Sequence, residues 1–151
     1  HAPYHAVIAA ELARVKAVHG IAILYDCHSI RSEIPFLFDG VLPIFNIGTN
    51  LGATCSQLIE QAVLDQCTAA TDYDTVLNGR FKGGWTTPIY GQPHDGIHAI
   101  QMETGKRGYM TEMPPWSFED DRAAGLRSIL GGVLNSLDKI ARSGALINQG
   151  T

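Results

Sequence analysis

The residues best suited to chemistry stand at the end of an apolar run. The segment 21–26 reads Ile-Ala-Ile-Leu-Tyr-Asp and is followed by Cys27 and His28. Such a run is typical of a buried strand, and side chains two apart in a strand share a face, so Asp26 and His28 can serve one site. A carboxylate commonly supports a metal-bound histidine in this way. A hydrogen-bonded loop histidine would show the same local pattern, so the pair alone does not fix the chemistry.

A second candidate, Glu103, ends the alternating segment 97–103. An ionised carboxylate is costly in apolar surroundings unless it is paired or has a function, and a raised pKa would suit a general base. Parallel strands would bring Glu103 and His28 to the same edge of a sheet, which is the geometry of a metal-bound water and the carboxylate that takes its proton. The alternative is an ion pair between Glu103 and Lys106 or Arg107.

Two arginines are candidates for binding an anionic group. The segment 78–84 reads Asn-Gly-Arg-Phe-Lys-Gly-Gly, and its glycines would let the backbone wrap closely around an anion. Within it, Arg80 could hold a carboxylate through two parallel hydrogen bonds. A solvated hairpin tip is the plain alternative. Arg31 is the second candidate, and a surface ion pair with Glu33 or Asp39 is its alternative.

The elements that must position these residues follow the order helix, strand, helix, strand, strand, helix. The expected bounds are helices at 3–19, 56–69 and 117–140, with Gly20 ending the first and Ser117 capping the last, and strands at 21–26, 75–77 and 97–103. The polar segment 29–54 is expected to be a long functional loop. This order predicts one α/β domain over residues 1–151, with a mixed, largely parallel sheet covered by helices.

Composition excludes several classes of partner. The chain has 151 residues, of which 45% are hydrophobic and 17% charged, and its formal net charge is −4. Nucleic acids and anionic membranes select for clustered Lys and Arg, which this sequence lacks. No apolar run approaches the roughly twenty residues of a membrane span. Three widely spaced cysteines predict free thiols rather than disulfides. A cytoplasmic protein that acts on a small molecule is expected.

Six short motifs occur in one order along the chain. They are Pro3-Tyr4-His5, Asp26-Cys-His28-Ser29-Ile-Arg31-Ser32, Asn46-Ile-Gly48-Thr49-Asn50, Asn78-Gly-Arg80-Phe-Lys82-Gly-Gly84, Tyr90-Gly91 and His98-Ala-Ile-Gln101-Met-Glu103. Together they resemble the N-formylglutamate deformylase (N-formylglutamate amidohydrolase) family. That family is similar to the zinc-carboxypeptidase and aspartoacylase group. The resemblance implies metal-dependent hydrolysis of N-formyl-L-glutamate to formate and L-glutamate, a closing step of histidine degradation.

The same resemblance implies a role for each candidate residue. The roles are metal ligand for His28, support of that ligand for Asp26, general base and acid for Glu103, binding of the two substrate carboxylates for Arg31 and Arg80, and a polar neighbour of the substrate for Asn78. The implied cofactor is a divalent metal, zinc in the first instance.

The sequence departs from the related hydrolases in one respect. Those enzymes take two further metal ligands, a histidine and an acid, from a region well before the last histidine ligand, whereas the residues before His28 contain no His-x-x-Glu. The chain is therefore expected to correspond to the C-terminal part of such an enzyme, to bind the metal weakly or not at all, and to be inactive alone. An exposed strand edge is expected to favour a homo-oligomer.

Two other functions remain open. A related N-acyl-amino-acid amidohydrolase would use the same site with a different acyl pocket. A metal-free dicarboxylate-binding module would use Arg31 and Arg80 to bind small dicarboxylates without turnover.

Overall fold

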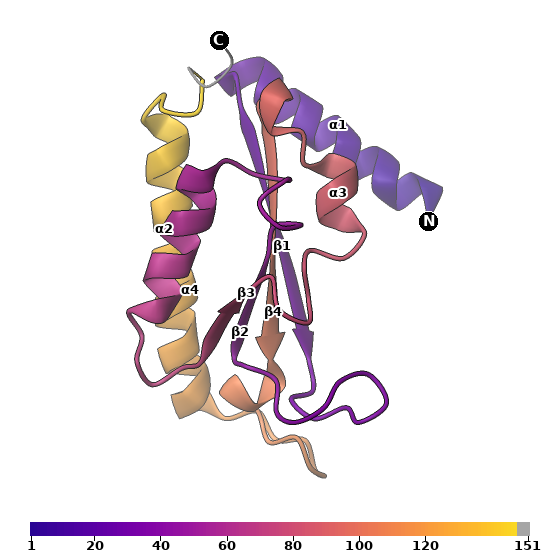
Figure 1. Cartoon of the computed structure of the whole chain (residues 1–151), viewed down its shortest axis with the longest axis vertical. Helices are drawn as coiled ribbons and strands as arrows, with labels where there is room; N and C mark the ends of the chain where they lie inside the picture. The colour runs from indigo at the N-terminus through magenta and orange to yellow at the C-terminus, as the bar shows by residue number, and fades with distance from the viewer. Residues whose placement is uncertain (148–151) are drawn as a thin grey trace.

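Four strands form one mixed sheet in the order β1-β4-β2-β3 in the computed structural model, which describes residues 1–147 (Figure 1). The strands are β1 (Ala22–Ile30), β2 (Phe45–Gly48), β3 (Thr75–Leu77) and β4 (Ile97–Gly105). β1 pairs with β4 and β2 with β3 in parallel, whereas β4 and β2 are antiparallel. The predicted mixed, largely parallel sheet is confirmed.

Helices cover both faces of this sheet. They are α1 (Ala2–His19), α2 (Gln57–Thr68), α3 (Thr86–Tyr90) and α4 (Asp120–Arg142), with short 3₁₀ turns η1 (Pro93–Asp95) and η2 (Lys106–Gly108). α2 and α4 pack against one another on one side, while α1 and α3 lie on the other (Figure 1). None of the helices within residues 1–147 combines the length and the apolar composition that a membrane span requires.

The main core lies between the sheet and the helix pair α2 and α4. Alternate strand residues face these helices, so their side chains are removed from water together. The fully buried members include Phe45, Ile47 and Ile100 from the strands and Ile59, Val63 and Val133 from the helices. Burying each aliphatic side chain contributes about 1.5–3 kcal/mol to stability. This face is therefore occupied by packing and cannot hold the site.

The opposite face carries a smaller core under α1 and α3. It contains Leu12, Ala22 and Tyr90, with Leu24 and other half-buried residues packed against them. On α1, Ile8 and Val15 pack beside Leu12, whereas Val18 on the same helix is 66% exposed. α1 ends as expected at Gly20, whose φ of 79° is the left-handed conformation that glycine adopts without strain. The remainder of this face is left for polar side chains.

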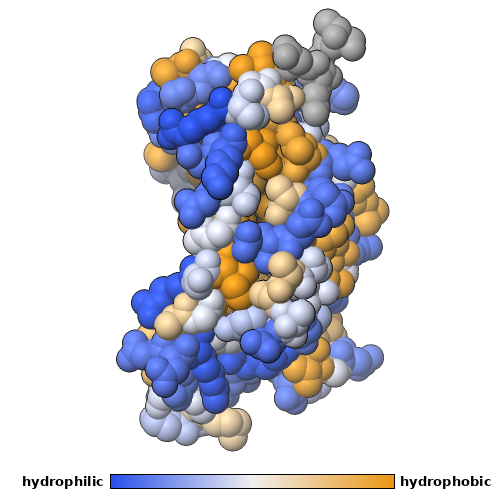
Figure 2. Space-filling view, turned by 90° about the vertical axis from the view of Figure 1, so that its left-hand side faces the viewer, coloured by the Kyte–Doolittle hydropathy of each residue, from blue (hydrophilic) through white to orange (hydrophobic). Residues whose placement is uncertain are grey.

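Apolar side chains also remain on the outer surface of the molecule. Figure 2 views the side on which α2 and α4 lie and shows hydrophobic residues gathered among hydrophilic ones. Leu58 on α2 and Leu134 on α4 are 40% and 52% exposed.

The structure differs from the predicted fold in four features. The segment 29–54 is not all loop, because Phe45–Gly48 forms the interior strand β2, a buried run too short to show alternation. Ser117 does not cap the last helix, which starts at Asp120 after Glu119, because the Ser117 carbonyl accepts a 2.8 Å hydrogen bond from Thr111 N. The five-residue helix α3 was not expected, and β1 continues past the predicted strand end to Ile30.

Candidate active site

The parallel pairing of β1 and β4 brings the predicted acid and base residues together. His28 is the register partner of Glu103, and Asp26 is the register partner of Gln101. Partners in adjacent strands point to the same face, and residues two apart along each strand share it. The predicted adjacency of His28 and Glu103 is therefore confirmed.

The carboxylate of Asp26 lies beside the imidazole of His28. The His28 Nε2 atom lies 3.0 Å from Asp26 Oδ2, with side-chain exposures of 47% and 15% respectively. A carboxylate next to one ring nitrogen favours a proton there, which leaves Nδ1 as the ring's acceptor. Within residues 1–147 this Nδ1 makes no hydrogen bond. The predicted contact between the two side chains is present, and the imidazole of His28 is partly open to solvent.

Glu103 is a buried carboxylate without a partner. The residue is 6% exposed, and in the described part of the chain its carboxylate makes no hydrogen bond or ion pair. Burial raises the pKa of Glu103, a nearby His28 opposes that rise, the charge of Asp26 adds to it, and Lys106 opposes it more weakly. The raised pKa agrees with the prediction for a general base.

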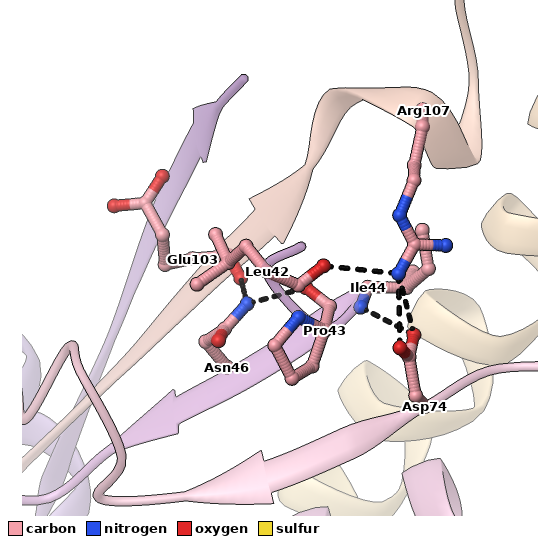
Figure 3. Close-up of polar contacts among 7 residues, drawn as sticks. All are labelled: Leu42, Pro43, Ile44, Asn46, Asp74, Glu103 and Arg107. Carbon is pink, nitrogen blue, oxygen red and sulfur yellow. Dashed lines mark hydrogen bonds and ion pairs between the residues drawn. The ribbon is translucent and has the colours of Figure 1, made fainter. Parts of the chain in front are cut away.

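The alternative ion pair of Glu103 with Arg107 is not formed, because Arg107 is engaged elsewhere. Its Nη2 donates to both carboxylate oxygens of Asp74 at 2.9 Å and to Leu42 O at 2.9 Å (Figure 3). These bonds tie the turn after β4 to the segments before β2 and β3. Arg107 therefore supports the sheet end next to the site.

The backbone of Glu103 is fixed from the neighbouring strand. Asn46 is its register partner in β2 and donates from Nδ2 to Glu103 O at 3.0 Å and to Pro43 O at 2.7 Å. In Figure 3 the carboxylate of Glu103 points away from these contacts. Asn46 is thus a supporting residue to which sequence reasoning gave no role, although it stands in one of the six motifs.

Asn78 connects the two loops beside the site. Its Oδ1 accepts from Thr49 N at 2.9 Å and from Leu51 N at 3.2 Å, and its Nδ2 donates to Thr49 Oγ1 at 2.8 Å. The Thr49 hydroxyl in turn donates to the Glu60 carboxylate. The side chain is therefore used within the protein, and its predicted contact with a substrate stays a prediction.

The two candidate arginines are exposed and have guanidinium groups available for an anion. Arg80 donates from Nε to Leu37 O at 3.1 Å, and its Cζ lies 5.6 Å from the ring centre of Phe81. Arg31 follows β1 directly and makes no ion pair within residues 1–147, so the alternative pairing with Glu33 or Asp39 is not formed. Binding of carboxylates by Arg31 and Arg80 stays a prediction.

The described residues contain no complete metal centre. Within residues 1–147, no three His, Cys, Asp or Glu side chains are grouped so as to hold a metal ion. Catalytic zinc takes three protein ligands and a water, and this face offers the single imidazole of His28. A surface groove of about 530 Å³ lies along α1, β1 and α4, and another of about 410 Å³ lies between α1 and β1. Neither of these grooves is lined by Asp26, His28 or Glu103.

The chain is similar to known proteins over most of its length. The family model of N-formylglutamate amidohydrolase matches residues 1–110. N-formylglutamate deformylases of Pseudomonas aeruginosa and Pseudomonas putida are 50% and 45% identical over 135 residues, which are 89% of this chain and 51% of each relative. The crystal structure of N-formylglutamate amidohydrolase from Ralstonia eutropha superposes with a TM-score of 0.78 at 20% identity, over 95% of this chain and 53% of that one.

The chain spans about half the length of the curated relatives that it matches. The matched residues include β1, β2 and β4, and with them Asp26, His28 and Glu103. The chain therefore belongs to the N-formylglutamate amidohydrolase family.

Proposed function

We propose that this chain contributes the general base and the anion-binding residues of an amidohydrolase that converts N-formyl-L-glutamate and water into L-glutamate and formate. The reaction would be a closing step of histidine degradation. The observation that carries the proposal is the buried, unpartnered carboxylate of Glu103 beside the Asp26–His28 pair, in a chain with 50% identity to a named deformylase.

Glu103 would move the protons of the reaction. As a base it takes a proton from the water that attacks the formyl carbon, and as an acid it returns a proton to the departing amino group. Both transfers need a carboxyl group whose pKa lies closer to neutral pH than that of an ordinary glutamate. The raised pKa of Glu103 supports this role. The proton is thus recycled, and no other group needs to be consumed.

Arg31 and Arg80 would bind the two carboxylates of the substrate. Both are exposed and have no carboxylate partner within the described residues, so their guanidinium groups are available for bidentate hydrogen bonds. Asn78 would act by fixing the loop that carries Arg80, through its bonds to Thr49 and Leu51.

A divalent metal, zinc in the first instance, would polarise the amide carbonyl and the attacking water, with His28 as one ligand and Asp26 as its support. The described residues do not fit a complete site, since they supply one imidazole where zinc needs three protein ligands. Further ligands would have to come from outside residues 1–147. We also infer a fold of the zinc-carboxypeptidase and aspartoacylase kind, which the mixed sheet with His28 and Glu103 at one strand end supports.

The proposal is tested on a protein that contains this chain together with the residues that complete the metal site, since the chain alone is expected to be inactive. Formate released from N-formyl-L-glutamate is measured for that protein and for its Glu103→Gln variant, with zinc added and with a chelator. We expect release that depends on Glu103. Release that is equal in both proteins would contradict the assignment of Glu103. Faster turnover of N-acetyl- or N-succinyl-glutamate would instead assign the site to a related N-acyl-amino-acid amidohydrolase.

A metal-free dicarboxylate-binding module is the second candidate, and the two unpaired arginines favour it. Glutamate binding that survives a chelator and the Glu103→Gln change, with no formate released, would decide for this module.

A further inference from the structure

One buried amide on the face that carries the candidate base has no partner. Gln101 lies two residues before Glu103 in β4 and is the register partner of Asp26 in β1 and of Gly48 in β2. It is 5% exposed, and its Oε1 is fully buried without a hydrogen bond. Its Nε2 also makes no hydrogen bond within residues 1–147. Leaving a buried amide unpaired costs free energy, so such a group calls for an explanation.

Two segments of the protein lie around the side-chain amide of Gln101 without hydrogen-bonding it. The glycine-rich segment 78–84, called the glycine loop below, runs beside Gln101. A β-carbon placed on Gly84 would lie 3.7 Å from Gln101 Oε1. The same loop touches β2 so closely that a β-carbon on Gly48 would lie 2.2 Å from Gly83 N. The amide therefore lies between the strand that carries Glu103 and the loop that carries Arg80.

The nearby amide of Asn46 differs from that of Gln101. Asn46 donates two hydrogen bonds from its Nδ2 and so has a structural function, although its Oδ1 is also buried and unpaired. Gln101 has both ends of its amide free. A free amide offers one acceptor and two donors without charge, which matches a group that itself presents one C=O and one N–H. Formamide is such a group, whereas a carboxylate is better matched by Arg31 or Arg80.

We infer that Gln101 is a substrate-binding residue that hydrogen-bonds the formamide group and holds it beside Glu103. This inference rests on the proposed function for the identity of the substrate. It also makes Gln101 the residue that distinguishes a formylated amino acid from a plain dicarboxylate.

The test compares two ligands that share two carboxylates but differ in the formamide: N-formyl-L-glutamate and glutarate. Their dissociation constants are measured by calorimetry in the Glu103→Gln background, which prevents turnover, with and without Gln101→Met. We expect Gln101→Met to reduce the preference for the formyl ligand about tenfold, as loss of a pair of hydrogen bonds predicts, and to leave glutarate binding unchanged. The matched control is Gln57→Met, an exposed position on α2.

Thermal unfolding separates binding from a structural function. If the amide serves a ligand, the melting temperature of Gln101→Met is equal to or above that of the wild type, because methionine needs no hydrogen bond. Gln101→Leu repeats the measurement with a branched side chain. The inference would be overturned if Gln101→Met and Gln101→Leu were both clearly less stable than the wild type. It would also be overturned if Gln101→Met left the preference for the formyl ligand unchanged in the Glu103→Gln background, or if no such preference existed with Gln101 intact.

Formate release keeps this inference distinct from the proposed function. No release from the protein with the completed metal site, together with formyl binding that depends on Gln101, would contradict the catalytic proposal and support the assignment of Gln101. Formate release by Gln101→Met with unchanged kcat/KM would overturn the assignment of Gln101 and leave the catalytic proposal intact.

Discussion

Glu103 combines burial, absence of a partner and a position next to an imidazole, and these properties predict how its amide variant behaves. Glu103→Gln keeps the size of the side chain but cannot take a proton, so we expect kcat for formate release to fall by about 10²–10⁴-fold. The raised pKa means that the folded chain binds this proton more tightly than the unfolded chain. Stability is therefore lost as pH rises from the ordinary glutamate range through the raised pKa, and Gln removes that loss.

Urea unfolding and initial rates check both parts of this prediction. Glu103→Gln is expected to be at least as stable as the wild type at neutral pH while nearly inactive. The outcome that would count against it is an inactive variant that is also less stable, since the loss would then reflect misfolding.

Arg80 predicts a different kinetic effect. Arg80→Lys keeps the charge but loses the planar fork that can grip a carboxylate in two places. Because binding of a remote carboxylate is the same in the ground and transition states, we expect KM to rise about tenfold with kcat nearly unchanged. Arg142→Lys on α4, where Arg142 forms a 2.8 Å exposed ion pair with Asp138, is the control. An unchanged KM for Arg80→Lys would mean that Arg80 does not bind the substrate and that the 78–84 loop is a solvated hairpin tip.

At the residue scale, sequence reasoning found the groups with obvious chemistry and missed those whose function depends on register. Asp26, His28 and Glu103 could be predicted because strand periodicity and parallel pairing together bring them to one face. Gln101 could not, because a glutamine in an alternating strand also suits a solvated face, and only the pairing with Asp26 shows it buried at the site.

At the scale of elements, the close approach of β2 to the glycine loop explains why Gly48 is required. A β-carbon on Gly48 would lie 2.2 Å from Gly83 N and 2.7 Å from Lys82 C, and both neighbours are backbone atoms that cannot move aside. Gly48→Ala is expected to destabilise the fold by about 1–3 kcal/mol, as overpacking does. Gly131→Ala in α4 is the control: nothing lies within 4 Å of its β-carbon, so it should stabilise the helix by about 0.5–1 kcal/mol. Equal effects in urea unfolding would contradict the packing argument.

His98 links the start of α2 to pH. Its Nδ1 accepts a 3.2 Å hydrogen bond from Ser56 N, and burial lowers the pKa of His98. Between the lowered pKa and the ordinary histidine value the unfolded chain binds more protons, so stability rises with pH across this window and is lost as pH falls through it. The variant His98→Asn retains an acceptor but does not titrate. We expect it to flatten the pH dependence of unfolding, whereas His94→Asn at an exposed turn should leave it unchanged.

Most of the helices and strands could be predicted from the sequence. Helices α1 and α2 and the strands β1, β3 and β4 follow from apolar spacing and from stops such as Gly20. β2 could not be predicted, because four buried residues have no alternation to detect, and its place in the sheet depends on contacts with β4 that are distant in sequence. The start of α4 was misplaced because the Ser117 backbone bonds to Thr111 instead of opening a helix.

At the scale of the whole molecule, β1 is an edge strand that carries half of the site. No strand of residues 1–147 pairs with its outer side, and the groove of about 530 Å³ beside it is lined by Ile21, Ile23 and Tyr25 from the sheet and by Leu134 from α4. An unpaired edge next to exposed apolar side chains is a template for association with another chain. We predict that the protein self-associates through this side of the molecule.

Light scattering after size-exclusion chromatography checks this prediction over a range of concentrations. The average mass is expected to rise with concentration, and Leu134→Lys should suppress the rise, because Leu134 is 52% exposed and a charge there opposes an apolar contact without disturbing the core. Leu51→Lys, at a 71% exposed position in the loop after β2, is the control and should have no effect. A mass of one chain at every concentration would contradict the prediction. Association that persists in Leu134→Lys but is lost in Leu51→Lys would place the contact at the loop after β2, next to Asn78.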